Sequence, residues 1–181
     1  MTVVLTALAM ASAAGINAYA TLLVLGILVR TEIVPLHSPT AEFFARPWVL
    51  AVLAVLYLVE FVADKVPAVD HAWDAVHTFV RPIAGAAAAV AVVSGHHSEG
   101  WVVLAAVLGG MTSLLFHGAK ATTRVGVTAV TGGTGNWAVS LVEDVFAVVT
   151  AAAGLLVPVL AAGLLLLAVL WFVRRRRARS R

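Results

Sequence analysis

Carboxylate side chains gather between two apolar runs that are each too short to cross a membrane. Residues 47–59 and 82–94 carry no charge, whereas a helix needs roughly 20 residues to cross the hydrocarbon core. Each run must therefore extend into the charged segment EFVADKVPAVDHAWDAVHTFVR, residues 60–81. Ionisable groups at membrane depth are costly and usually mark a functional site. The pattern predicts a site that handles protons, ions or a charged solute.

The spacing within this segment places its acids on helix faces. Glu60 and Asp64 are four residues apart and share one face. Asp70, Asp74 and His77 follow beyond a proline at the spacing of a second face. Asp70 and Asp74 could instead be solvated loop charges that cap a helix N-terminus. Glu60 lies within the length that the helix needs, so we expect it to have a buried partner.

A basic stripe follows later in the chain. His117, Lys120 and Arg124 have the spacing i, i+3 and i+7, which places them on one helix face. Such a stripe could bind an anionic group. Alternatively, these long side chains could extend from a helix end to water at the membrane surface.

A glycine-rich turn leads into a third charged group. The string TGGTGNWAVSLVED, residues 131–144, ends with Glu143 and Asp144 inside an apolar run. Glycines before a helix could present backbone N–H groups to an anion, although a plain flexible loop would have the same composition. No Gly-Lys-Ser/Thr follows, so the turn is not a Walker loop.

The charges of these groups are complementary. Opposite charges in a low-dielectric interior should pair, so we expect them to meet in the half of the bundle that faces the cytoplasm. Acids outnumber bases, and the surplus could hold protons or bind a divalent cation through oxygen ligands. A purely structural network is the alternative. The candidate substrate- or ion-binding residues are Glu60, Asp64, Lys65, Asp70, Asp74, Arg81, His117, Lys120, Arg124, Glu143 and Asp144.

The composition is that of an integral membrane protein. The 181 residues are 62% hydrophobic and 12% charged, against about 25% charged in soluble domains. We expect one helical domain over 1–173 and a basic tail over 174–181. That tail holds 6 of the 12 Lys and Arg residues, so the basic balance indicates membrane orientation and contact with anionic lipid, not nucleic-acid binding. The absence of cysteine excludes disulfides and thiolate chemistry.

The expected fold is an all-α, polytopic bundle of about six membrane helices. The first helix should be interrupted near Gly15 and Asn17, and the last two could instead form one tilted helix. With six helices, the inner side, with its loops 66–75 and 120–136, carries Lys65, Arg81, Lys120, Arg124 and the six arginines of the tail. This excess of basic residues places both termini in the cytoplasm. Three helices plus three could form an inverted repeat, as in many small transporters. The expected helices are 3–29, 46–65, 76–95, 101–119, 137–155 and 157–173.

The motif strings resemble those of a bacterial membrane family. EFVADKVPAVDHAWDAVH, RPIAGA, HGAKATTR, GGTGN and SLVED together are similar to domain-of-unknown-function family four-one-two-six. The resemblance implies a multi-helix protein of the bacterial inner membrane and brings no established activity or catalytic residue. It also implies that the following residues belong to one motif set: Glu60, Asp64, Lys65, Asp70, Lys120, Arg124, Glu143 and Asp144.

Three functions are consistent with the sequence. The first is a small permease that moves a solute or ion past the polar cluster, with proton or cation coupling and, given its size, as a homodimer. The second is a membrane-embedded enzyme that acts on a lipid or a lipid-linked phosphate, with acids binding a metal. The third is a non-catalytic scaffold whose charges pair with a partner's helices. We favour a permease over an enzyme, because no metal motif of known spacing is present.

Overall fold

The computed structural model is all α-helical and describes residues 2–65, 67–95 and 97–179, although a few side chains in these ranges are not described. The all-α class predicted from the sequence is confirmed. The helices are α1 (Thr2–Ile16), α2 (Ala18–Arg30), α3 (Pro39–Phe44), α4 (Pro47–Ala63), α5 (Pro67–Val93), α6 (Glu99–Thr131), α7 (Asn136–Leu156) and α8 (Pro158–Arg179).

Three of these helices are long and apolar enough to cross a membrane. They comprise Ala72–Val93 of α5 and the whole of α6 and α7. The helices α1, α2 and α4 are apolar but shorter, with 15, 13 and 17 residues. The structure therefore shows three candidate spans within the described residues, and the six full crossings expected from the sequence are not shown.

The first predicted helix, 3–29, is broken as expected. Asn17 separates α1 from α2 and has an extended backbone, with φ −144° and ψ 105°. Its side-chain oxygen accepts a hydrogen bond of 2.9 Å from the backbone N–H of Ala20, which caps the start of α2. One long apolar run thus becomes two short helices with a polar residue between them.

Two predicted loops are largely helical. We expected loops over 66–75 and 120–136, but α5 begins at Pro67 and α6 continues to Thr131. Asp74, Lys120 and Arg124, which lie in these stretches, find buried partners, so they do not need to leave the helix to reach water. Helix α6 ends only at Gly132, whose φ of +61° is the left-handed conformation that glycine adopts readily.

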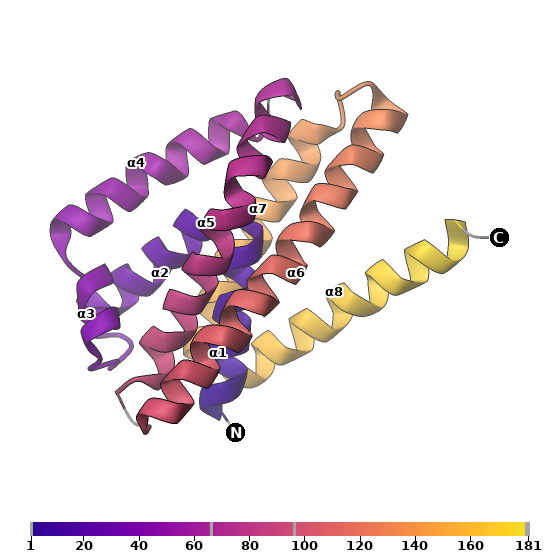
Figure 1. Cartoon of the computed structure of the whole chain (residues 1–181). Coiled ribbons are helices and arrows are strands. Elements are labelled where there is room, and N and C mark those ends of the chain that lie inside the picture. Colours follow the sequence, from indigo (N-terminus) through magenta and orange to yellow (C-terminus); the bar gives the residue numbers. More distant parts are fainter. Residues whose placement is uncertain (1, 66, 96, 180–181) are drawn as a thin grey trace.

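The C-terminal apolar run also divides. Helix α7 ends at Leu156 and α8 begins at Pro158, because proline cannot continue the hydrogen-bonding pattern of a helix interior. The alternative of one tilted helix is therefore wrong. Figure 1 shows α8 leaving the bundle at an angle, so that its C-terminal end lies apart from the other helices.

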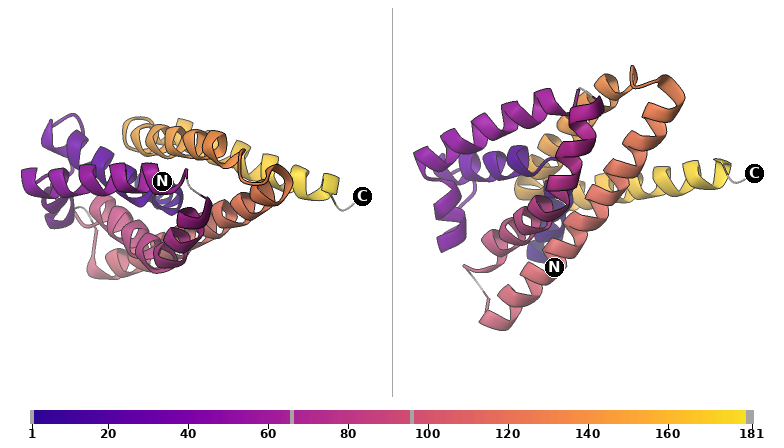
Figure 2. Two further views of the ribbon diagram at one scale, coloured as in Figure 1. Left: turned by 90° about the horizontal axis from the view of Figure 1, so that it is seen from above. Right: turned by 45° about the horizontal axis from the view of Figure 1, so that its top comes forward.

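Helix α1 lies at the centre of the packing between α5, α6 and α7. Helix α1 packs against α5, α6 and α7, and Figure 2 shows α5 and α6 crossing on one side of the molecule with α7 on the other. Helices α2, α3 and α4 form an outer layer beside α5 and α7. This arrangement brings the end of α4 and the first half of α5 toward the second half of α6 and the start of α7.

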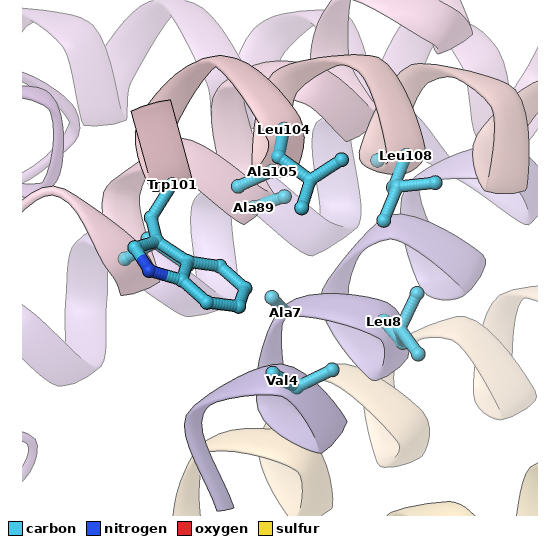
Figure 3. A pocket seen from close by; sticks show the side chains of 10 residues that line it. Val4, Ala7, Leu8, Ala89, Trp101, Leu104, Ala105 and Leu108 are labelled. Atoms are coloured by element: carbon cyan, nitrogen blue, oxygen red, sulfur yellow. The ribbon is translucent and has the colours of Figure 1, made fainter. Parts of the chain in front are cut away.

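Small residues join the helices at the opposite end of the bundle. A Cβ atom on Gly109 of α6 would lie 2.7 Å from the Gly85 carbonyl oxygen and 2.7 Å from the Ala89 Cβ of α5. A small apolar hollow of about 60 Å³ lies between α1, α5 and α6, and Figure 3 shows Trp101 at its edge. The buried contacts between α5 and α6 at this end are therefore tight and are made by uncharged residues.

Candidate functional site

A network of buried ion pairs links α4, α5, α6 and α7. Its members come from segments that are up to about half the chain apart, and most of their side chains are buried. Three groups can be distinguished, of which two are centred on basic side chains and the third on Asp144.

Arg81 of α5 centres the first group. Its Nη2 donates to the Glu60 Oε1 of α4 at 2.8 Å, and its Nη1 lies 3.3 Å from Asp74 Oδ1. Arg81 and Glu60 are both 0% exposed. The buried partner expected for Glu60 is therefore Arg81, which also pairs with Asp74 about two helical turns earlier on its own helix.

His117 of α6 also belongs to this group, and its contacts with Thr78 and Arg81 fix the tautomer of its imidazole ring. Thr78 donates its hydroxyl hydrogen to the Asp74 carbonyl oxygen at 3.0 Å, so its oxygen can only accept from His117 Nε2 at 3.1 Å. His117 Nδ1 is then free to accept from Arg81 Nη1 at 2.5 Å. The contacts thus require a neutral imidazole with its hydrogen on Nε2.

Lys120 and Arg124 of α6 centre the second group. Lys120 Nζ lies 2.5 Å from Asp64 Oδ2, and also donates to the Ile16 carbonyl oxygen at 3.2 Å. Arg124 donates to Glu143 Oε2 from two nitrogens, at 2.6 and 2.9 Å, and to the Asp64 carbonyl oxygen at 2.7 Å. The break after α1 therefore supplies an acceptor to the network, because its last carbonyl groups lack partners within the helix.

Asp144 of α7 forms the third and most loosely paired group. Its Oδ1 accepts 2.9 Å from the Asn17 amide, while Lys65 Nζ lies 3.7 Å from its Oδ2. Oδ2 is buried and has no hydrogen bond among the described residues. Lys65 donates instead to the Phe61 carbonyl oxygen at 2.7 Å and lies over the Phe61 ring. Asp144 is thus held mainly by a neutral amide.

The described side chains of the network do not balance in charge. One carboxylate is in excess, counting five acids against four bases with neutral histidines. Several buried oxygens, including Glu60 Oε2 and Asp64 Oδ1, also have no hydrogen-bond partner among the described atoms. The acids are Glu60, Asp64, Asp74, Glu143 and Asp144, and the bases are Lys65, Arg81, Lys120 and Arg124.

Asp64 and Lys65 lie between α4 and α5, outside the three candidate spans. Burial alone would raise the pKa of the Asp64 carboxyl, but Lys120 and Arg124 outweigh burial and hold that pKa below its usual value. Burial lowers the pKa of the Lys65 ammonium, and the attraction of Asp144 offsets only part of this effect. Asp64 is therefore firmly ionised, whereas Lys65 is a weakened cation.

A large apolar cavity adjoins the second group. It has a volume of about 640 Å³ and lies between α6, α7 and α8. Lys120 and Glu143 line its polar part, and four aromatic residues contribute to its apolar walls. The network is therefore not sealed on this side, because Glu143 is 15% exposed.

The structure brings together nearly every residue that the sequence singled out. Asp70 belongs to α5, but its side chain lies outside the described residues. In the described part of the chain, no three acidic or histidine side chains are grouped so as to hold a metal ion. The turn at 131–135 is mostly exposed and closes the α6–α7 hairpin.

Sequence reasoning missed Asn17 as a member of the network. The sequence marked it only as a helix interruption, yet its amide binds Asp144 and its side chain is fully buried. Thr78 and Ser140 were also missed, and they contact His117 and Lys65. A polar residue inside an apolar run was the available signal for Asn17, whereas Thr78 and Ser140 have no distinguishing feature in the sequence.

Comparison with known proteins gives one match. The family model described as Domain of unknown function (DUF4126) matches residues 4–177. No curated protein matches the chain, and no solved structure matches it.

Proposed function

We propose, from the premise that this chain belongs to that family of unknown function, that it is a small membrane permease in which Asp144 carries a proton or a cation. The main support for this proposal is that the charge of Asp144 is incompletely neutralised. Asn17 gives it one neutral hydrogen bond at 2.9 Å, and the only ammonium near it among the described residues is Lys65 at 3.7 Å.

The excess carboxylate supports proton or cation coupling. A buried, unpaired carboxylate is costly, so the surplus charge in this network favours uptake of a proton or a positive ion. Glu60 and Glu143 each accept at least one hydrogen bond of 2.8 Å or less from an arginine. Asp144 accepts none from a cation, and its nearest cation is farther away than that of Asp74, at 3.7 Å against 3.3 Å. Asp144 is therefore the group that exchanges its partner at the lowest cost.

The broken helix supports movement at this position. Asn17 separates α1 from α2 and donates a hydrogen bond from its amide to Asp144. The carbonyl oxygen of the preceding residue, Ile16, accepts a hydrogen bond from Lys120. Interrupted helices beside a buried ion site are the usual arrangement in secondary transporters. A small shift of α1 against α2 would change the partners of Asp144 and Lys120 together.

Charge movement in proteoliposomes tests this proposal. A rapid pH jump on a solid-supported membrane should produce a transient current as Asp144 gains or loses its proton. Asp144→Asn should abolish the current, and Asp144→Glu should restore part of it. Glu99→Gln, which alters an exposed acid at the start of α6, is the control and should leave the current intact. Equal currents from Asp144→Asn and the parent protein would overturn the proposal.

The other two functions remain outcomes of this test. A folded parent protein without any proton-dependent current would favour a scaffold, in which the ion pairs serve only to join helices. Metal-dependent turnover of a lipid phosphate by such a protein would favour an enzyme. We favour neither function, because Lys120 and Arg124 are both engaged by carboxylates and so do not present a ready site for phosphate.

A further inference from the structure

We propose that the cavity between α6, α7 and α8 binds a lipophilic organic cation, with Glu143 as its counter-ion. This inference rests on the proposed permease function, because it names the class of solute that the permease would move. Its physical basis is independent, because it concerns a different carboxylate and a different space.

The size and lining of the cavity suit such a molecule. Its volume of about 640 Å³ lies within the range of roughly 300–1,000 Å³ that is typical of small-molecule sites. Four aromatic side chains from three helices line it, and they are Phe116, Phe146, Trp171 and Phe172. Aromatic faces attract organic cations through their quadrupoles, so the walls favour a positive ligand as well as an apolar one.

The accessible charge in the cavity is negative. Glu143 and Lys120 both line it, but the Glu143 side chain is 15% exposed and the Lys120 side chain only 2%. Lys120 Nζ is also occupied by Asp64 and by the Ile16 carbonyl oxygen. An incoming molecule therefore meets a carboxylate rather than an ammonium, which favours a cation over an anion of the same size.

The position of Glu143 connects the cavity to the ion network. The two hydrogen bonds that Arg124 donates to Glu143 both end on one carboxylate oxygen, Oε2. A ligand cation that approached the carboxylate would compete with Arg124 for its charge. Asp144, the next residue along α7, faces a different side, toward Asn17. Solute binding at Glu143 and proton binding at Asp144 are thus adjacent along one helix.

The test uses two probes that share one shape and differ in charge. Tetraphenylphosphonium and tetraphenylborate are each equilibrated by dialysis against the purified full-length protein in detergent. We expect saturable phosphonium binding that is at least about tenfold tighter than borate binding, a difference of about 1.4 kcal/mol. Equal or tighter borate binding, or no saturable phosphonium binding, would overturn the inference.

A cavity-filling substitution avoids the ion network. Ala168 of α8 lines the cavity, so Ala168→Trp should reduce phosphonium affinity about tenfold or more by occupying the site. Leu167→Trp is the matched control, because Leu167 is 65% exposed on the same helix and does not line the cavity. Unchanged affinity in Ala168→Trp would also overturn the inference.

The same set of proteins separates this inference from the permease proposal. Glu99→Gln should keep its phosphonium affinity within about twofold, because Glu99 is an exposed acid far along α6 from the cavity and does not line it. Lost binding in Ala168→Trp together with intact pH-jump currents in the parent supports both proposals. Currents without phosphonium binding would remove the solute site and leave the function of Asp144 standing.

Discussion

The two ends of this helical bundle are joined by opposite means. At the end near the start of α1, the contacts between α1, α5 and α6 are made by alanine and glycine, with Ala9, Ala11 and Ala88 at 0% exposure. At the other end, Arg81 and Arg124 are equally buried and paired with carboxylates. Lipid tails are as apolar as leucine, so helices in a membrane associate through close packing or polar contacts. In this chain, close packing joins the helices at one end and polar contacts join them at the other.

The difference predicts two kinds of sensitivity. The alanine and glycine end should tolerate the loss of a methyl group poorly and the gain of one worse, because neighbouring backbones are already in contact. The charged end should tolerate small changes of volume but not of charge, because a single lost partner leaves a buried ion unpaired. Function is expected at the charged end, where alternative pairings exist.

The largest effect is expected from Arg81→Met. This change leaves Glu60 and Asp74 buried without their cation, which should cost about 3–5 kcal/mol of unfolding free energy. Thermal unfolding in detergent, followed by tryptophan fluorescence, measures the loss. Adding Glu60→Met to the variant should recover a large part of it.

An exposed arginine provides the comparison for this variant. Arg46 lies at the surface before α4, and Arg46→Met should leave the unfolding temperature within the error of the parent. If Arg81→Met were no less stable than Arg46→Met, the buried ion pairs would not hold the charged end together.

A smaller loss is expected from Gly109→Ala at the apolar end. The new methyl group would lie 2.7 Å from Ala89 Cβ and from the Gly85 carbonyl oxygen, and overpacking of this kind costs about 1–3 kcal/mol. Gly118→Ala is the matched control on the same helix, because its Cβ would meet nothing within 4 Å. Alanine is the better helix former, so this control should gain about 0.5–1 kcal/mol. The same unfolding assay should separate the two variants, and equal effects would contradict close packing at Gly109.

A smaller effect again is expected where the two ends meet. Asn17→Ala removes the amide that binds Asp144 and the oxygen that caps α2, at a cost of about 1–2 kcal/mol. Thr31→Ala is the control, because it removes a polar side chain at the other, exposed end of α2. It should change stability little. Equal unfolding temperatures for the two variants would show that Asn17 only interrupts the helix.

Much of the charged end follows from the sequence. His117, Lys120 and Arg124 are spaced for one helix face, and the structure buries all three on α6. Glu60 lies inside a run too short to span without it, and the structure gives it a buried partner. Helical periodicity and the cost of burying charge are local arguments, so they succeed where one helix decides the outcome.

Features that depend on two distant segments could not be predicted in the same way. The loops expected at 66–75 and 120–136 are largely helical, because ion pairs keep their described charged side chains buried. One of these pairs, Lys120 with Asp64, joins residues 56 positions apart. The pairing of Asn17 with Asp144 spans most of the chain. The cavity depends on the angle at which α8 leaves the bundle, which no pattern within α8 specifies.

The smallest effect is expected in the pH dependence of stability at Asp64, where the direction of the change is well defined. Lys120 and Arg124 hold the pKa of Asp64 below its usual value of about 3.9 despite burial. An acid with a depressed folded pKa stabilises the fold above its unfolded pKa, and this stabilisation is lost as the pH falls through the folded pKa. The gap in unfolding temperature between the parent and Asp64→Asn should therefore stay constant from pH 7 to about pH 5 and narrow only below about pH 4. Glu42→Gln, at an exposed acid of α3, should show no gap at any pH. A gap that closed between pH 6 and pH 5 would mean that burial outweighs Lys120 and Arg124 at this carboxylate, and the charged end would then be held together less tightly than its geometry indicates.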